Sequence, residues 1–244
     1  MNTTETLRIF NEIKLLGIAQ CYQLMIDLLP NQELPDTHTA AAMFAEAQQT
    51  WQKDKQTATN IKNARLRYQI TPQEIECSTA RGLSKEQWII LSECRYIKEG
   101  TNIIILGATG VGKSAIACAL GLQACISGFK AKYFNMNRLI EDVKAAKLNG
   151  SYLKLLDQIA KSPLLILDDF GLKALDKDIR VAFYEILEDR SGRSSTIITS
   201  QLPIPNWYDK FGDSTLAEAC LDRITGNSYK INLTGNSRRS KKKA

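Results

Sequence analysis

The sequence predicts an α/β fold, in which a five-stranded parallel sheet carries helices on both faces and follows a small N-terminal helical domain. Downstream of residue 83, short apolar runs alternate with segments of helical periodicity. Upstream of residue 70, apolar residues recur at helical spacing alone. We therefore expect a helical domain over residues 1–70, a linker over 71–82, an α/β domain over 83–237 and a basic tail over 238–244.

The N-terminal domain is expected to contain short helices. The first covers residues 6–16, and Gly17 separates it from a second that ends before Pro30, because glycine weakens a helix and proline ends it. A third covers residues 40–51. The apolar stripes of these helices indicate packing of one helix on another rather than a ligand site.

Residues 53–68 turn basic, with Asp54 as the single acid and Tyr68 at the end of the run. A basic helix that ends in an aromatic residue can bind DNA, and it can equally be a solvated face. The run alone favours neither interpretation. Its basic side chains are Lys53, Lys55, Lys62, Arg65 and Arg67.

Strands and helices alternate through the predicted α/β domain. The expected strands are apolar and lack polar alternation, as strands buried on both faces do. They cover residues 102–106, 132–135, 164–167, 196–199 and 229–233. The expected helices cover residues 114–126, 138–146, 152–160, 179–189 and 216–224.

Composition argues against several classes of protein. No run approaches the ~18 uninterrupted apolar residues of a membrane span, and the N-terminus lacks a signal-peptide pattern, so we expect a cytoplasmic protein with no membrane partner. The six cysteines form no Cys-x-x-Cys pair and His38 is the only histidine, which disfavours a zinc site or a histidine-activated nucleophile. The net charge is +6, and the tail, which suits a phosphate backbone or merely aids solubility, contains Arg238, Arg239, Lys241, Lys242 and Lys243.

Residues 107–114 match the pattern G-x-x-x-x-G-K-[ST] in full, directly after an apolar strand and at the start of a helix. In such a P-loop the backbone N–H groups surround phosphates and the helix N-terminus favours negative charge. Lys113 is expected to reach the β- and γ-phosphates of ATP, and Ser114 to bind Mg²⁺. The candidate nucleotide-binding residues are Gly107, Ala108, Thr109, Gly110, Val111, Gly112, Lys113, Ser114 and Ala115.

The apolar run of residues 164–167 leads directly into Asp168 and Asp169, which is the Walker B pattern. At the carboxyl end of a buried strand, Asp168 can bind Mg²⁺ through its water shell while Asp169 orients the attacking water. A capping or turn role for the pair is the alternative. Beside a complete P-loop the catalytic interpretation is favoured.

Two further side chains are candidates for catalysis. Gln201 follows the strand at 196–199, where a polar group can touch the γ-phosphate or the attacking water, the position called sensor 1. Arg223 can reach the γ-phosphate of a neighbouring subunit and stabilise charge there, which would make hydrolysis depend on assembly. The alternative for Gln201 is an ordinary polar residue in a loop, and the alternative for Arg223 is a surface ion pair. Arg190 and Arg193 are weaker candidates for a role at the boundary between subunits.

Taken together, these residues resemble the IstB/DnaC branch of the AAA+ P-loop ATPases, and IstB-like transposition helpers more closely. The likeness spans nearly the whole chain. Its most discriminating part lies near the C-terminus, because P-loops and Walker B aspartates are shared by many NTPases. The matching segments are residues 80–83, 107–114, 164–171, 195–200, 211–213, 216–217 and 221–223.

The resemblance implies an ATP- and Mg²⁺-dependent ATPase that binds duplex DNA, forms a homo-oligomer, selects or remodels a target site and activates a partner transposase. It implies that the N-terminal domain helps to hold DNA and neighbouring subunits. It therefore raises the expectation that the basic run at 53–68 faces DNA. By the same resemblance, Arg138, Lys144, Lys147 and Lys154 are expected to line a DNA-binding surface.

The chain departs from this family at two positions. Relatives often carry glutamate where Asp169 stands and asparagine where Gln201 stands. Since a misplacement of ~1 Å can cost on the order of 10²-fold in rate, we expect slow hydrolysis, with ATP acting chiefly as an assembly switch. No sensor-2 arginine is evident on a C-terminal lid.

Three other functions stay open from the sequence. A replicative helicase loader shares the ATPase core and differs in what its N-terminal domain binds. A small-molecule kinase would need a lid and an acceptor pocket, and the paired aspartates with Asp222 and Arg223 disfavour it. A DNA-binding scaffold that binds ATP without cleaving it is consistent with Asp169 and Gln201.

Overall fold

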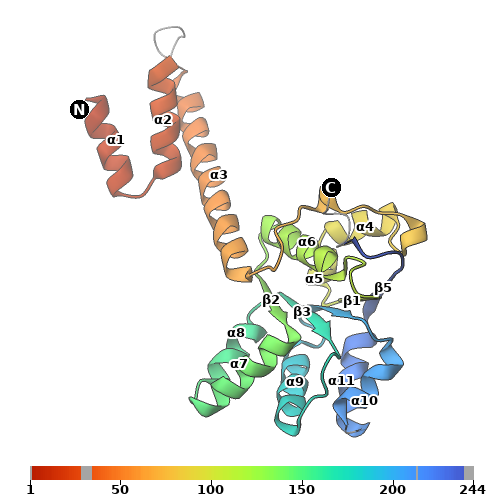
Figure 1. Cartoon of the computed structure of the whole chain (residues 1–244). Coiled ribbons are helices and arrows are strands. Elements are labelled where there is room, and N and C mark those ends of the chain that lie inside the picture. The colour runs from red at the N-terminus through yellow and green to blue at the C-terminus, as the bar shows by residue number, and fades with distance from the viewer. Residues whose placement is uncertain (1, 29–34, 213, 239–244) are drawn as a thin grey trace. The chain divides into compact units, whose positions relative to one another are not determined.

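The computed structural model describes residues 2–28, 35–212 and 214–238 and divides the chain into two units (Figure 1). The first unit ends at Thr59 and the second begins at Asn60. The division thus falls before residue 70, where the sequence places the end of the helical domain. Arg239 and the lysines of the predicted basic tail lie outside the described residues, as does Asp213.

Three helices build the first unit: α1 (Thr3–Glu12), α2 (Leu16–Leu28) and most of α3 (Thr37–Ala64). The expected break at Gly17 is wrong, because the chain turns at Lys14, whose φ of 62° is left-handed, and Gly17 lies in the first turn of α2. A Cβ at Gly17 would lie 2.5 Å from the carbonyl oxygen of Ala47. Gly17 therefore allows α2 and α3 to pack closely rather than separating two helices.

The first unit buries few side chains. The ring of Tyr22 contacts those of Phe10 and Phe44 edge to face, with ring centroids 5.9 and 6.2 Å apart. Among its described residues, only Gly17 and Ala19 are buried. Several large apolar side chains are exposed instead: Ile13, Leu24, Leu28 and Met43.

The helix α3 joins two segments that the sequence separates. The expected third helix and the start of the basic run form one helix that ends at Ala64. Arg65 then adopts a left-handed conformation, with φ of 53°, so Arg67 and Tyr68 follow the helix rather than end it. The expectation of a basic helix as far as Tyr68 is therefore wrong in its last residues.

A five-stranded parallel sheet forms the second unit and confirms the predicted fold class. The strand order is β2-β3-β4-β1-β5. All five expected strands are present, each within two or three residues of its predicted bounds. The strands are β1 (Asn102–Gly107), β2 (Ala131–Asn135), β3 (Leu164–Phe170), β4 (Ser195–Ser200) and β5 (Ser228–Leu233).

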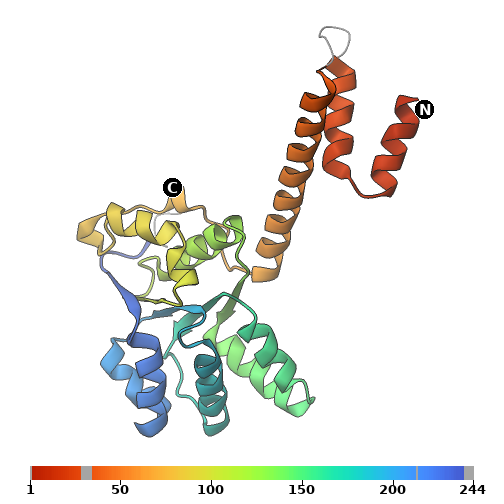
Figure 2. The same ribbon diagram turned by 180° about the vertical axis from the view of Figure 1, so that it is seen from behind.

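Helices cover both faces of the sheet (Figures 1 and 2). One face carries α4 (Lys85–Ser92), α5 (Arg95–Lys98) and α6 (Lys113–Ile126). The opposite face carries α7 (Met136–Leu148), α8 (Tyr152–Ala160), α9 (Lys177–Arg190), α10 (Tyr208–Phe211), preceded by η3 (Ile204–Trp207), and α11 (Ser214–Thr225). Alternate residues of β1 enter the two cores, Ile103 and Ile105 on the α6 side and Ile104 on the α9 side.

The segment between α3 and α4 packs in the second unit. It contains the short helices η1 (Pro72–Glu74) and η2 (Thr79–Arg81). The indole N–H of Trp88 donates to the carbonyl of Pro72 at 3.1 Å, and the carbonyl of Arg81 accepts from Thr234 N at 3.0 Å. The residues that the sequence assigns to a linker are thus hydrogen-bonded to α4 near their start and to the residue after β5 near their end.

Arg190 ends α9 inside the protein, with 2% of its surface exposed. Its guanidinium donates to the carbonyls of Ile159, Ser162 and Ser195 and to the hydroxyl of Thr196, all of which are neutral groups. This arginine therefore ties α8 to the starts of β3 and β4. Its burial argues against the weaker role at a subunit boundary that the sequence allowed.

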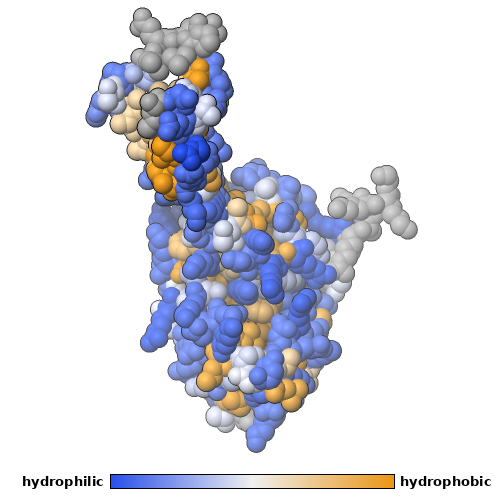
Figure 3. All heavy atoms as spheres, turned by 90° about the vertical axis from the view of Figure 1, so that its left-hand side faces the viewer, coloured by the Kyte–Doolittle hydropathy of each residue, from blue (hydrophilic) through white to orange (hydrophobic). Residues whose placement is uncertain are grey.

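The surface shown in Figure 3 is mainly hydrophilic, with apolar side chains scattered over it. Among the described helices, none combines the length and the apolar character that crossing a membrane requires.

Candidate functional site

The loop between β1 and α6 forms the centre of the site. Three of its glycines have positive φ, at 149° for Gly107, 85° for Gly110 and 104° for Gly112. These values favour glycine, so the loop can turn its backbone N–H groups inward and pass directly into α6. Lys113, the first residue of α6, donates from Nζ to the carbonyls of Gly107 and Ala108, both at 2.9 Å.

Asp168 lies at the carboxyl end of β3 and has no exposed surface. Three hydroxyl groups donate to its carboxylate: Ser114 at 2.8 Å and Thr199 at 2.6 Å to Oδ1, and Tyr133 at 2.7 Å to Oδ2. Burial, together with the bond to Asp168, raises the pKa of Tyr133 well above its usual value, so this hydroxyl stays a donor. The sequence assigned both Ser114 and Asp168 to Mg²⁺, and the structure brings the two side chains together.

The Ser114 hydroxyl and the Asp168 carboxylate fit a magnesium ion. Both are hard oxygen donors, and their oxygens are 2.8 Å apart at the start of α6. Mg²⁺ in proteins commonly uses one or two such groups and completes its shell with nucleotide phosphates and water. The donor set therefore suits a cation that binds together with a nucleotide.

Asp169 follows in an uncommon conformation. Its φ is 63°, and the pairing of β3 with β4 shifts register between Leu167 and Phe170. The Thr199 hydroxyl accepts from its backbone N–H at 3.0 Å, and the amide of Asn135 donates to its Oδ2 at 3.1 Å. A left-handed aspartate costs on the order of 1 kcal/mol, so these two contacts hold a carboxylate where the strand alone would not place it.

Three of these side chains are absent from the sequence-based site. Tyr133 and Asn135 lie on β2, and Thr199 lies on β4, at the same edge of the sheet as the Walker B aspartates. Polar residues at the ends of neighbouring parallel strands are a signal for such a site. The same signal that singles out Gln201 in the sequence is present at these three residues.

Gln201 is brought to the P-loop, as a sensor-1 residue requires. Its Oε1 accepts from the hydroxyl of Thr109 at 2.7 Å. Arg223 is held elsewhere, against α9, where it pairs with Glu188 and lies 4.9 Å from the ring centroid of Tyr184. The hydrogen bond to Glu188 raises the pKa of Arg223. The structure therefore assembles the P-loop, both aspartates and Gln201, and leaves Arg223 on a separate surface.

The last described residues lie against the P-loop. Arg238 donates from its backbone N–H to the carbonyl of Gly110 at 2.9 Å, and Arg81 donates from Nη2 to the carbonyl of Val111 at 2.8 Å. A Cβ on Gly110 would lie 2.2 Å from the Ser237 hydroxyl. Arg238, assigned by the sequence to a basic tail, is thus part of the surroundings of the P-loop.

The predicted DNA-binding residues fall into separate groups. Lys53 and Lys55 lie in the part of α3 that belongs to the first unit, and Lys62 and Lys154 are exposed in the second unit. Lys144 and Lys147 on α7 pair with acids at the start of α9, with N···O distances of 2.6 and 3.2 Å. Arg65, Arg67 and Arg138 line one cavity of about 730 Å³.

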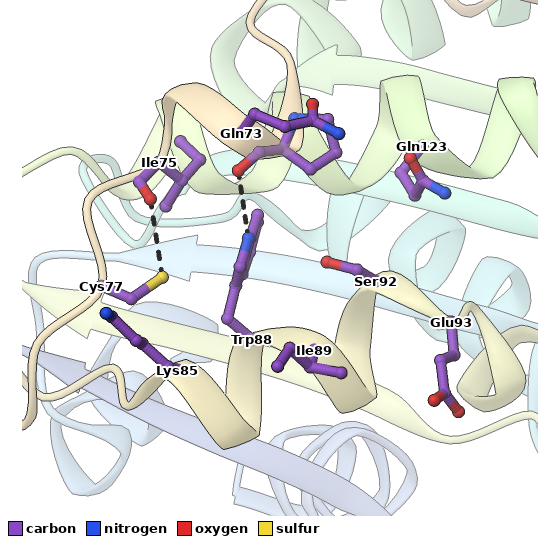
Figure 4. A pocket seen from close by; sticks show the side chains of 10 residues that line it. Gln73, Ile75, Cys77, Lys85, Trp88, Ile89, Ser92, Glu93 and Gln123 are labelled. Atoms are coloured by element: carbon purple, nitrogen blue, oxygen red, sulfur yellow. Dashed lines mark hydrogen bonds between the residues drawn. The ribbon is translucent and has the colours of Figure 1, made fainter.

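A second cavity, of about 530 Å³, lies between η1, α4 and the last turn of α6 (Figure 4). Trp88 and Ile75 contribute its apolar wall, and Lys85 and Glu93 lie at its sides. Gln123, the α6 residue in its lining, lies near the end of α6 opposite the P-loop. The cavity is therefore separate from the phosphate-binding part of the site.

The strand order, the P-loop after β1 and the paired aspartates at the carboxyl end of β3 define a P-loop ATPase fold of the AAA+ kind. Residues 10–244 match the profile of the family described as IstB-like ATP binding protein. The chain belongs to this family.

Relatives and solved structures agree with that assignment. The chain is 36% identical over 234 residues to an insertion-sequence ATP-binding protein of Sinorhizobium fredii, covering 96% of this chain and 95% of the relative. It is 31% identical to the insertion sequence IS21 ATP-binding protein of Pseudomonas aeruginosa, over 80% of this chain and 75% of the relative.

Two solved structures share the fold. The DnaC helicase loader has a TM-score of 0.58 at 20% identity, over 68% of this chain and 98% of that one. AMPPCP-bound DnaA from Aquifex aeolicus has a TM-score of 0.59 at 18% identity, over 72% of this chain and 53% of that one. At these identities the likeness shows the AAA+ fold alone.

Proposed function

We propose that this protein is an ATP-dependent, DNA-binding helper of an insertion-sequence transposase. It forms a homo-oligomer on duplex target DNA, selects or remodels that DNA, and activates the transposase. Hydrolysis of ATP then drives disassembly. The observation that carries the proposal is the hydroxyl of Ser114 beside the buried carboxylate of Asp168, at the foot of a complete P-loop in a chain of this family.

The residues of the site would divide the work of hydrolysis. Lys113 exchanges its carbonyl partners for the β- and γ-phosphate oxygens, which are stronger acceptors because they are charged. Ser114 and Asp168 would hold Mg²⁺ together with the nucleotide, and the ion would supply positive charge that neutralises the phosphates. Asp169 orients the attacking water, and Gln201, already at Thr109, contacts the γ-phosphate.

Slow turnover follows from the short reach of Asp169. Thr199 fixes the backbone of this residue and Asn135 holds its carboxylate, which therefore cannot move toward the water without losing the contact with Asn135. We expect Asp169→Glu to raise DNA-stimulated ATP turnover, because the added methylene extends the carboxylate toward the γ-phosphate. Phosphate release measured with duplex DNA present checks this.

Glu141→Asp on α7 is the control for Asp169→Glu, because it also changes the length of an acidic side chain by one methylene, at an exposed position. It should leave turnover unaltered. Equal or lower turnover in Asp169→Glu would show that the length of this side chain does not limit the rate.

Assembly would bring Arg223 to the nucleotide of a neighbouring subunit. Within its own chain this arginine contacts α9 rather than the P-loop, as a residue offered to a neighbour would. The sparsely buried first unit, with Ile13, Leu24 and Leu28 exposed, supports further contacts between subunits or with the partner. ATP binding would then favour the assembled state.

A mixture of two inactive variants tests this role of Arg223. Asp169→Asn removes hydrolysis from its own site but keeps Arg223, whereas Arg223→Ala keeps its own site but offers no arginine. If the arginine acts between subunits, the mixture should hydrolyse ATP on DNA although each variant alone does not. Phosphate release at several mixing ratios measures the effect.

Glu188→Gln is the control, because it frees Arg223 from its partner within the chain without removing it. This variant should remain active. If the mixture stays as inactive as its components while both variants still sediment as assemblies, Arg223 does not complete a neighbouring site.

A replicative helicase loader is the alternative, and the shared fold with the DnaC loader favours considering it. The two functions differ in the partner protein: a loader binds the replicative helicase, whereas a transposition helper binds the transposase. Capture of an insertion-sequence transposase, but not of the replicative helicase, supports the transposition helper. Capture of the helicase alone contradicts it.

Strand transfer in vitro tests the whole function. Purified transposase, donor ends and a target plasmid should give insertions that increase when this protein and ATP are added. ADP or the variant Lys113→Ala should abolish the increase. Insertion at the same level without this protein would contradict a helper role.

A further inference from the structure

The cavity beside the Walker B aspartates has an unusual lining. It has a volume of about 730 Å³ and lies outside the carboxyl end of β2, where open α/β sheets bind ligands. We call it the arginine pocket. It is lined by Arg65, Arg67, Tyr133, Phe134, Asn135, Arg138 and Asp142.

Positive charge dominates this lining. Asp142 is its single carboxylate, against three guanidinium groups that come from two distant segments of the chain. In the part of the chain that the structure describes, neither Arg65 nor Arg138 has a carboxylate oxygen within ion-pair distance. The planar guanidinium group matches the oxygens of a phosphate in two-point contacts, so the pocket suits a phosphate group.

Arg67 joins this pocket to the catalytic carboxylates. One of its terminal nitrogens lies 3.6 Å from Oδ2 of Asp168 and 3.7 Å from Oδ2 of Asp169. Asp168 is completely buried, whereas 40% of the Arg67 side chain is exposed. The arginine therefore supplies positive charge to two neighbouring carboxylates, while part of its side chain is exposed to solvent and packs against the ring of Tyr68.

One of these two carboxylates, that of Asp168, would also hold a magnesium ion together with Ser114. A guanidinium and a divalent cation near Asp168 repel each other, so each weakens the binding of the other. A phosphate in the arginine pocket would attract Arg67 away from the aspartates. Binding in the pocket and binding of the cation would then support each other, and such coupling is reciprocal.

We propose that the arginine pocket binds a backbone phosphate of DNA, and that this phosphate withdraws Arg67 from Asp168 and Asp169 so that Mg²⁺·ATP binds more tightly. The identification of the phosphate as that of DNA rests on the proposed function. Arg67 acts here as a positioning residue. The pocket gives the protein a direct way to sense DNA at the nucleotide site.

The test measures nucleotide binding without hydrolysis. A fluorescent, slowly hydrolysed ATP analogue is titrated with Mg²⁺, with and without saturating duplex DNA, and DNA affinity is measured in parallel by anisotropy. In the unaltered protein, DNA should lower the half-saturating Mg²⁺ concentration by at least about fivefold. An unchanged Mg²⁺ dependence, with DNA bound, overturns the proposal.

Variants of the arginine pocket separate its effect on Mg²⁺·ATP binding from its effect on DNA binding. Arg67→Gln should bind Mg²⁺·ATP without DNA as tightly as the unaltered protein does with DNA, and DNA should have no further effect. Arg67→Lys, which keeps the charge, should retain the weak Mg²⁺ response. Arg138→Gln should weaken DNA binding several-fold and require more DNA for the same shift. Arg95→Gln, at an exposed ion pair with Glu93, is the matched control and should change neither measurement.

The polyanion is identified by replacing DNA. Inorganic phosphate at the same phosphate concentration, or polyglutamate at the same charge, should not shift the Mg²⁺ dependence. A shift with either of them but none with DNA overturns the assignment to nucleic acid. Absence of any DNA binding by the unaltered protein would overturn the proposed function as well, whereas DNA binding without a Mg²⁺ shift overturns this inference alone.

Discussion

Replacing Asp168 with asparagine should lower ATP hydrolysis on the order of 10²-fold or more, because the substitution removes the charge that holds the metal beside the transferred phosphate. The carboxylate accepts from Ser114, Thr199 and Tyr133 in a position with no solvent exposure. Asparagine keeps one oxygen for the first two hydroxyls and turns its amide toward Tyr133, whose oxygen can accept instead. The fold should therefore survive.

Phosphate release against Mg²⁺ concentration, with circular dichroism of the same samples, measures the effect. Asp157→Asn, at an exposed ion pair with Lys161, is the matched control and should hydrolyse ATP normally. Hydrolysis by Asp168→Asn within a few-fold of the unaltered protein would remove Asp168 from the metal site.

Replacing Arg190 with methionine should lower the free energy of unfolding by about 3 kcal/mol or more, because buried oxygens lose a charged donor. The guanidinium donates to the carbonyls of Ile159 and Ser162 at 2.9 and 2.7 Å, and to two groups on β4. Burial lowers the pKa of Arg190 to about 10, so the group is still charged at neutral pH. Methionine fills similar volume but satisfies none of these oxygens.

Chemical denaturation compares Arg190→Met with Arg193→Met, an exposed arginine in the following turn. The control should stay within about 0.5 kcal/mol of the unaltered protein. If the two variants unfolded at the same denaturant concentration, the contacts of Arg190 would contribute nothing net to stability.

The sheet was predictable because its strands carry their own signal. Runs such as residues 103–106 and 164–167 are apolar without alternation, which only strands buried on both faces require. The P-loop and Walker B motifs were predictable for a related reason, since each is a local pattern attached to such a strand. The pairing of Ser114 with Asp168 follows from both motifs together.

Long-range contacts explain what the sequence did not reveal. Gly17 resembles a helix break until the backbone of Ala47 is placed against it. Arg190 resembles a surface residue until α8, β3 and β4 converge on it. The ion pairs of Arg67 with the aspartates join segments about a hundred residues apart, and no local pattern encodes that contact.

The N-terminal boundary also depends on tertiary packing. Residues 71–82 have the polar and helix-breaking composition of a linker, yet Pro72 is buried and its carbonyl accepts from Trp88. Local composition identifies this segment as a connection. It does not tell which unit the segment packs against.

Sedimentation of the purified protein with duplex DNA tests the central claim most directly. ATP, ADP and no nucleotide are compared, with Lys113→Ala alongside. ATP-dependent growth into a DNA-bound assembly, lost in the variant, is the predicted result. Monomers that bind no DNA under any nucleotide condition would contradict the account.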